Sequence, residues 1–179
     1  MRISLFLNDE DYVQYNIFYQ FNTPQGKRTI LIGKLLTPIV SLLFVLFFYL
    51  KDFPAYLILI EIFILSGISV WGWLTYEGKI KRRIHRQVED LKKQGKLPYD
   101  AEATLDLSNE MIMDYTPSKT IRIEWSDVRA IWTNEIYIFV MIGAVQAIII
   151  PRRCLNGMDY DVIQFLSSRS QRTPAVCKL

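Results

Sequence analysis

The sequence predicts an α+β membrane protein, in which a two-helix transmembrane hairpin carries a small antiparallel β-sandwich or partly open barrel with a C-terminal helix. Two apolar runs, 29–50 and 55–75, predict the hairpin. Each has about the ~20 residues that a helix needs to cross a hydrocarbon core. The connection 51–54 is so short that the two helices are antiparallel. After residue 101 the hydrophobic period changes to two, which predicts strands.

The N-terminal segment, 1–28, contains a strand and an amphipathic helix. Arg2–Leu7 is rich in β-prone residues, and Asp9–Phe21 carries aromatic stripes at helical spacing with acidic residues in its first turn. Helices that lie in a bilayer interface usually carry Lys and Arg on the polar face. Because this polar face is acidic, we expect the helix to pack against protein.

The stretch 76–97 is predicted to continue the second apolar helix as a cytoplasmic basic helical stalk. Ile80, Ile84, Val88 and Leu91 recur at spacings of three and four and form a narrow apolar seam. Two interpretations of the seam remain open. It packs against the N-terminal helix, or it forms a homodimer through a short coiled coil.

The C-terminal part, 98–168, is predicted to be a small β domain. Its strands are expected at 104–107, 111–115, 119–123, 128–133, 136–142 and 146–150, and a closing helix at 159–168. Because six short strands make a marginal core, we expect Arg2–Leu7 to join the sheet as a seventh. The remainder, 169–179, is expected to be a flexible tail.

The positive charges predict the topology. Lys and Arg lie before the first apolar run and after the second, whereas the turn offers only Lys51 beside Asp52. The bias of basic residues toward the cytoplasm places both termini inside. The first run is too long and too far from Met1 for a signal peptide, so we expect it to stay in the mature protein.

Three short motifs accompany this order of elements: Glu10–Val13, Ile123–Val128 and Ile149–Arg153. With them, the layout resembles the YcxB-like family of small bacterial membrane proteins. The resemblance implies a pleckstrin-homology-like domain on a two-helix anchor in the bacterial cytoplasmic membrane. The family's biochemical function is not established, so it implies no catalytic residues. Within the motifs we interpret four residues as structural: Trp125, Ser126, Asp127 and Pro151.

Several charged residues are candidates for binding. Five basic residues are candidates for contact with anionic lipid headgroups or with a partner protein: Arg82, Arg83, Arg86, Arg152 and Arg153. For the last two, a solvated loop is an equal alternative. Glu61 is the one charge well inside an apolar run, where ionisable residues often serve transport or partner binding. Two structural alternatives stay open: Lys51 reaches down from the turn to pair with Glu61, or Glu61 is protonated and hydrogen-bonded toward Ser41.

Enzymatic chemistry is not indicated. No paired acid and base, phosphate-binding glycine loop or metal-ligand spacing occurs, and neither cysteine has a histidine near it in the sequence. We therefore expect that the protein is not an enzyme and that it binds no cofactor and no metal. The net charge of +3 is concentrated beside the predicted membrane helix, so lipid is a more plausible partner than nucleic acid.

Two functional hypotheses remain. The first is a membrane-anchored cytoplasmic binding or regulatory module that recognises a peptide, protein or lipid headgroup. The second is an accessory subunit of a membrane transport complex, or of another membrane-protein complex, that acts through the hairpin and Glu61.

Overall fold

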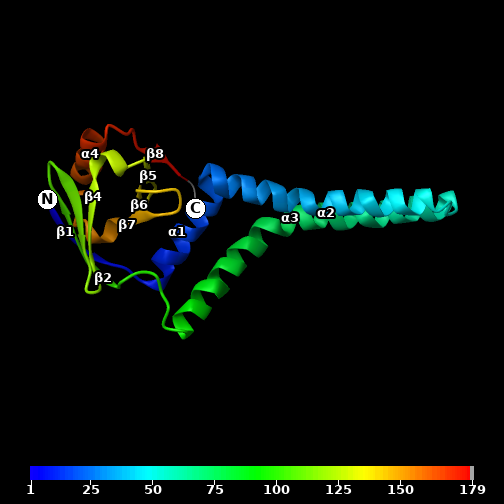
Figure 1. Cartoon of the computed structure of the whole chain (residues 1–179), viewed down its shortest axis with the longest axis horizontal. Helices are drawn as coiled ribbons and strands as arrows, with labels where there is room; N and C mark the ends of the chain where they lie inside the picture. Colours follow the sequence, from blue (N-terminus) through cyan, green and yellow to red (C-terminus); the bar gives the residue numbers. More distant parts are fainter. Residues whose placement is uncertain (178–179) are drawn as a thin grey trace. The chain divides into compact units, whose positions relative to one another are not determined.

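A computed structural model describes residues 1–177 of the chain (Figure 1). The chain forms two compact units. The hairpin unit is Gln20–Arg86. The sheet unit combines Met1–Tyr19 with Gln87–Leu179.

The hairpin unit consists mainly of two long helices, α2 (Pro24–Leu50) and α3 (Ala55–Lys93, which continues into the sheet unit). The hydroxyl of Thr23 caps α2 by accepting the Gly26 N–H at 3.1 Å, and Pro24 occupies the first turn, where no N–H is needed. By length and composition both helices are able to cross a membrane. Only 6% of the apolar window of α2, and none of that of α3, is buried within the protein.

The second apolar helix continues unbroken to Lys93, through most of the stretch 76–97 that was predicted as a helical stalk. Gly95 adopts a positive φ of 65°, and the Lys96 N–H donates to the Leu91 carbonyl at 2.9 Å. This is the left-handed ending that glycine favours at a helix C-terminus.

The sheet unit contains two four-stranded sheets and no closed barrel within residues 1–177. The first sheet has the order β1-β2-β3-β4 and is antiparallel throughout: β1 (Arg2–Phe6), β2 (Glu102–Leu107), β3 (Met111–Tyr115) and β4 (Thr120–Glu124). The second has the order β7-β6-β5-β8: β5 (Ala130–Thr133), β6 (Tyr137–Met141), β7 (Ala147–Pro151) and β8 (Ala175–Val176). The α+β class and the six predicted C-terminal strands are thus confirmed.

The N-terminal strand joins the distant sheet, as the sequence predicted. β1 pairs antiparallel with β2 along its whole length, from Arg2 opposite Asp106 to Phe6 opposite Glu102. Its inward side chains, Ile3 and Leu5, are each 2% exposed. β1 therefore supplies core side chains as well as backbone pairing.

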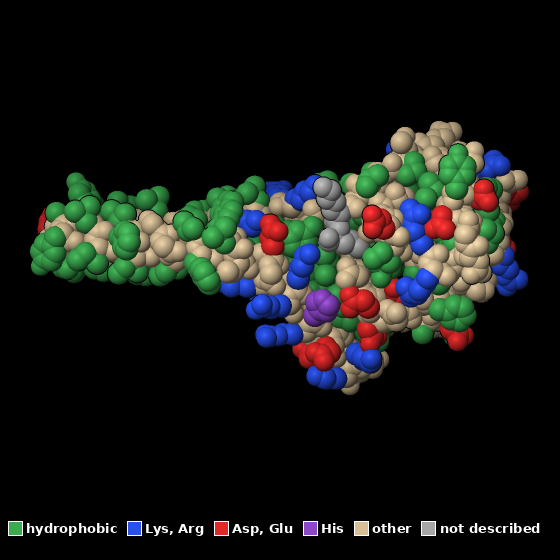
Figure 2. Space-filling model, turned by 180° about the vertical axis from the view of Figure 1, so that it is seen from behind, with side chains coloured by type: hydrophobic (Ala, Val, Ile, Leu, Met, Phe, Trp, Pro, Cys, Tyr) green, Lys and Arg blue, Asp and Glu red, His purple; other side chains and the backbone are tan. Residues whose placement is uncertain are grey.

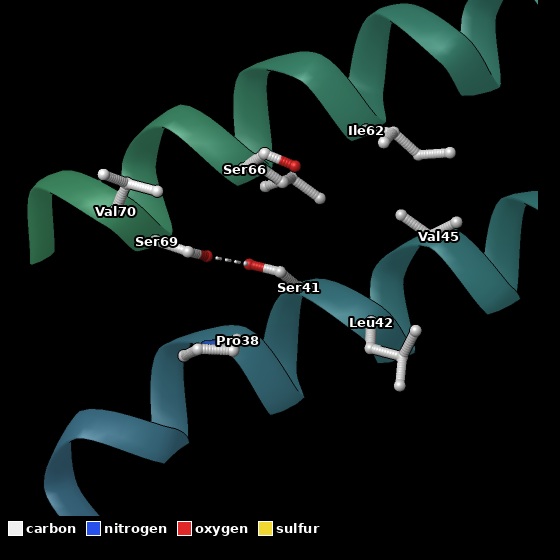
Figure 3. A pocket seen from close by; sticks show the side chains of 9 residues that line it. Pro38, Ser41, Leu42, Val45, Ile62, Ser66, Ser69 and Val70 are labelled. Carbon is white, nitrogen blue, oxygen red and sulfur yellow. Dashed lines mark hydrogen bonds between the residues drawn. The ribbon is translucent and has the colours of Figure 1, made fainter. Parts of the chain in front are cut away.

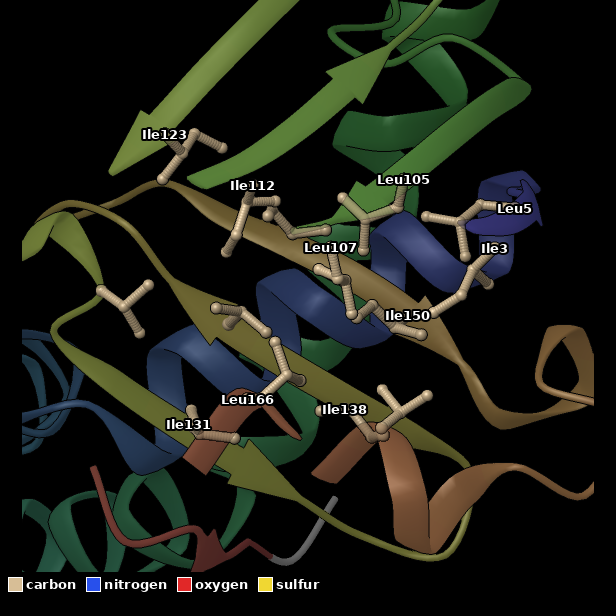
Figure 4. Close-up of a cluster of buried hydrophobic side chains, with 14 of the residues drawn as sticks. Ile3, Leu5, Leu105, Leu107, Ile112, Ile123, Ile131, Ile138, Ile150 and Leu166 are labelled. Atoms are coloured by element: carbon tan, nitrogen blue, oxygen red, sulfur yellow. The ribbon is translucent and has the colours of Figure 1, made fainter. Parts of the chain in front are cut away.

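The main core lies between the two sheets and is closed by α4 (Asp159–Ser170), which contributes Val162 and Leu166 (Figure 4). Period-two alternation decides which strand residues enter it. On β6, Ile138 and Val140 face this core, whereas Tyr137, Phe139 and Met141 face a second cluster. All five β6 side chains are buried, so the second sheet is covered on both faces.

The second cluster packs α1 (Asp9–Asn22) against the other face of the second sheet. Phe18 is fully buried and stacks on Phe139, with ring centroids 4.4 Å apart, while Trp132 meets Phe18 edge-on at 5.7 Å. The expectation that this helix packs against protein is confirmed. The aromatic residues of α1 cover the second sheet, a contact that the sequence did not predict.

The flexible tail expected at 169–179 is wrong for the residues that the structure describes. α4 continues to Ser170, and β8 pairs in parallel with β5. Cys177 is buried in the second cluster. The cause is a long-range pairing that local polarity does not reveal. Residues 178–179 lie outside the described part of the chain.

Candidate functional site

The Trp-Ser-Asp motif forms a short 3₁₀ turn, η1 (Trp125–Asp127), between β4 and β5. The Trp125 indole packs at the margin of the main core, meets Phe165 edge-on at 5.9 Å, and donates its N–H to the Ser108 carbonyl at 3.2 Å. Ser126 and Asp127 are exposed in the turn, and Pro151 is the last residue of β7. Trp125 therefore packs in a structural position, whereas no side chain caps the 3₁₀ turn and the Ser126 hydroxyl donates to Glu124 at 3.3 Å.

The two arginines that follow Pro151 lie in a second 3₁₀ turn, η2 (Arg152–Cys154), and both already have carboxylate partners. Arg152 donates to Asp159 at 3.1 Å. Arg153 binds Asp11 through both terminal nitrogens. Both guanidinium groups are thus already paired with carboxylates of the same chain.

Asp11 is the most completely buried charged group among residues 1–177, with an exposed fraction of 1%. Arg153 donates to its two carboxylate oxygens at 2.7 and 2.5 Å, and Tyr137 donates a third hydrogen bond at 2.9 Å. Arg153 makes a further hydrogen bond to the Phe6 carbonyl at 2.9 Å. The group joins β1, α1, β6 and η2, so its role is to hold elements from both ends of the chain together.

Local sequence explains why Asp11 points inward. The Asn8 side chain accepts the Asp11 N–H at 2.9 Å, and the Asp11 carboxylate accepts the Asn8 N–H at 2.7 Å. This is a capping box, with aspartate in the place of the usual glutamate. Sequence reasoning treated Asp11 only as a first-turn acid and missed this site. The Asn-x-x-Asp spacing was the available signal.

The surroundings of Asp11 favour its ionised form. Burial by itself raises the pKa of Asp11, but hydrogen bonds from Arg153, the Asn8 backbone and Tyr137 outweigh it, so the net pKa lies below its ordinary value of 3.8. Burial, and then the bond to Asp11, raise the pKa of Tyr137 to about 12. With its donors already in place, the carboxylate is suited to fixing structure and not to moving protons.

A pH dependence follows from the lowered pKa of Asp11. The group stabilises the folded chain at pH values above 3.8, and this contribution is lost as pH falls through the lower folded pKa. Below pH 3.8 we expect the unfolding free energy of the Asp11→Asn variant to fall less steeply with pH than that of the unchanged chain. Urea titration of the detergent-solubilised proteins measures this difference. The exposed Asp161→Asn is the control. An unchanged acid limb in Asp11→Asn would contradict this assignment.

A second polar contact ties α1 to the end of α3 within the sheet unit. Asp9 accepts from Lys92 at 2.5 Å and from the Tyr99 hydroxyl at 2.7 Å. Val88, a seam residue that belongs to this unit, is buried. The intramolecular interpretation of the seam is therefore favoured, and homodimerisation through it stays a prediction.

The predicted basic residues of α3 are exposed. Lys79, Arg82, Arg83 and Arg86 recur at spacings that place them on one side of the helix, which we call the basic face. Within residues 1–177 none of the four forms an ion pair. Figure 2 shows Lys and Arg side chains gathered beside the single histidine. The basic face is thus available to an anionic ligand.

An open groove of about 460 Å³ lies between the two helices of the hairpin (Figure 3). Its lining includes Pro38, Ser41, Leu42, Ile62 and Ser69. Ser41 and Ser69 share a hydrogen bond of 3.3 Å across it. The alternative bond from Glu61 to Ser41 is not seen in the structure, where the Ser41 hydroxyl bonds to Ser69. Within residues 1–177 the Glu61 side chain makes no hydrogen bond or ion pair, and Lys34 binds Glu77 instead at 2.7 Å.

Comparison with known proteins gives one match. Residues 107–164 match the model of the family described as YcxB-like protein, which confirms the resemblance over this stretch. The match runs from the end of β2 into α4 and includes η1 and η2, but not the hairpin. No curated protein and no solved structure matches the chain.

Proposed function

Because part of the sheet unit matches the YcxB-like family, we propose that the protein is a non-enzymatic, membrane-anchored module of the bacterial cytoplasmic membrane. The hairpin crosses the bilayer twice, and both termini are cytoplasmic. The sheet unit is a pleckstrin-homology-like binding or regulatory domain presented at the inner surface. Lipid headgroups there are contacted by the basic face.

The observation that carries the anchoring proposal is the exposure of the hairpin's apolar side chains. Phe63 is 82% exposed, Leu74 73% and Leu42 68%. Apolar surface left in water costs about 25 cal/mol per Å². Side chains of this kind, continued over two whole helices, suit a hydrocarbon environment, where the backbone is already satisfied internally. Aromatic residues near both ends suit the headgroup regions: Tyr49, Tyr56, Trp71, Trp73 and Tyr76.

Reporter fusions test the anchoring and its direction. We expect a reporter after Leu179 to be active in the cytoplasm and one inserted between Asp52 and Phe53 to be active outside, because the basic residues flank the ends away from the turn. The full chain should also resist extraction by alkaline carbonate. An external C-terminus, or a chain released by carbonate, would contradict the proposal.

Anionic lipid should stabilise the chain through the basic face. Each basic side chain near an anionic surface contributes about 1 kcal/mol. We expect phosphatidylglycerol to raise the Tm of the detergent-solubilised chain more than phosphatidylcholine does. Replacing Arg82, Arg83 and Arg86 together by Glu should abolish that difference. The matched control replaces three exposed arginines of the sheet unit by Glu: Arg2, Arg122 and Arg129. Equal effects of the two triple variants would reject the basic face as the lipid contact.

The second candidate function, an accessory subunit acting through the hairpin, is favoured by one observation. Glu61 lies in the apolar stretch of α3 without a partner among residues 1–177, and unpaired carboxyl groups are costly in a membrane. A neighbouring membrane protein could supply that partner. An interaction lost in Glu61→Gln would favour the subunit, whereas one that survives would favour the tethered module.

A further inference from the structure

The edge of the second sheet is occupied by a short piece of the chain's own C-terminal segment. β8 contributes two residue pairs, Trp132 with Ala175 and Thr133 with Val176, and it is parallel where every other pairing among residues 1–177 is antiparallel. The Cys177 N–H continues the pairing by donating to the Thr133 carbonyl at 2.9 Å. We call 172–177 the edge segment.

The edge segment is held by few contacts. Val176 is 81% exposed, and Cys177 is its one buried side chain, 3% exposed. At its start, Gln171 adopts a left-handed φ of 56° directly after α4, and the Arg172 side chain donates to the Val128 carbonyl at 3.3 Å. A segment with so little buried apolar surface belongs to the least stable part of a fold.

The Cys177 side chain, in contrast to the rest of the edge segment, occupies a buried apolar site. Cys177 belongs to the second cluster, which also contains four aromatic side chains of α1 and β6: Tyr15, Phe18, Tyr137 and Phe139. If the edge segment leaves, β5 exposes both a row of backbone donors and acceptors and this apolar place. An open strand edge with a side-chain site beside it is what binding by strand addition requires.

We propose that the β5 edge binds an extended peptide segment of a partner protein, which adds in parallel and places a small apolar side chain where Cys177 lies. The edge segment occupies the site until such a peptide displaces it. The inference rests on the proposed function only in treating the sheet unit as a binding module. The ligand is an unmodified peptide.

The test compares two detergent-solubilised proteins, the intact chain and a chain truncated after Gln171. The probe is a fluorescein-labelled peptide of residues 172–177. By fluorescence polarisation we expect the peptide to bind the truncated chain at least tenfold more tightly than the intact chain. N-methylation of Cys177 in the peptide removes the N–H that meets Thr133 and should weaken binding at least tenfold. N-methylation of Val176, whose N–H points away from β5 by strand alternation, is the matched control.

Three results would overturn the proposal. The first is a truncated chain that retains its near-UV circular dichroism but binds no peptide. The second is equal binding of the two methylated peptides. The third is a dimer of the intact chain that truncation abolishes, since this would assign the edge to a second copy's C-terminal segment.

If the truncated chain does not fold, hydrogen exchange of the intact chain decides. We expect the Cys177 amide to exchange at least a hundredfold faster than the amides of β6, and equal rates would overturn the proposal. None of these measurements needs a membrane, so their failure leaves the anchoring proposal intact. Failure of the reporter fusions likewise leaves peptide binding intact.

Discussion

Replacing Arg153 by Met lowers the unfolding free energy of the chain by about 3 kcal/mol, because it leaves the buried Asp11 carboxylate without its charged partner. Tyr137 and the Asn8 N–H still bond to the carboxylate, so the expected loss is at the lower end for a broken buried pair. Urea titration of the detergent-solubilised chain, followed by tryptophan fluorescence, measures the change.

The adjacent Arg152 provides the matched control. Its pair with Asp159 is partly exposed, 28% for each side chain, so Arg152→Met should cost about 1 kcal/mol or less. Adding Asp11→Asn to Arg153→Met should recover part of the loss, because no unpaired charge then remains buried. Similar losses for Arg152→Met and Arg153→Met would show that Asp11 does not depend on its ion pair.

Deleting Arg2–Leu7 abolishes cooperative unfolding of the sheet unit, although the deleted residues are far in sequence from the remaining strands. The deletion removes two core side chains, Ile3 and Leu5, and each such loss costs about 2–5 kcal/mol. The sum approaches the whole stability of a small domain, about 5–15 kcal/mol. The backbone edge of β2 is also uncovered.

Limited proteolysis and near-UV circular dichroism of the full chain measure this effect. Leu5→Ala should show a smaller loss, about 2–5 kcal/mol, while Phe6→Ala, at a position 58% exposed, should change stability little. Unchanged protease resistance of residues 98–168 after the deletion would show that β1 is dispensable for the sheet unit.

Most helices and strands could be predicted because their signals are local. The change of hydrophobic period after residue 101 places β2 to β7. The two apolar runs place the turn between the long helices, and the seam in 76–97 predicts that α3 continues beyond its apolar run. The pairing of β1 was also accessible, since a six-stranded core of this size is marginal and only one other β-prone segment exists.

The site around Asp11 was not predicted, because its partners are distant in sequence. Arg153 is 142 residues away and Tyr137 126. Neither residue carries a local pattern that selects its partner, and Arg153 in particular resembles an ordinary loop cation. The same holds for Cys177, whose segment is polar and short but becomes ordered by pairing with β5.

From the amino-acid order alone follow the α+β class, the apolar hairpin, the continuous α3 and the resemblance to the YcxB-like family, because periodicity, run length and short motifs are properties of neighbouring residues. Only the tertiary structure decided that Arg153 neutralises Asp11, that α1 covers the second sheet, and that the β5 edge is occupied by the chain itself. These contacts depend on which surfaces meet after chain closure, and burial then determines which charges are paired and which, such as the basic face, remain available.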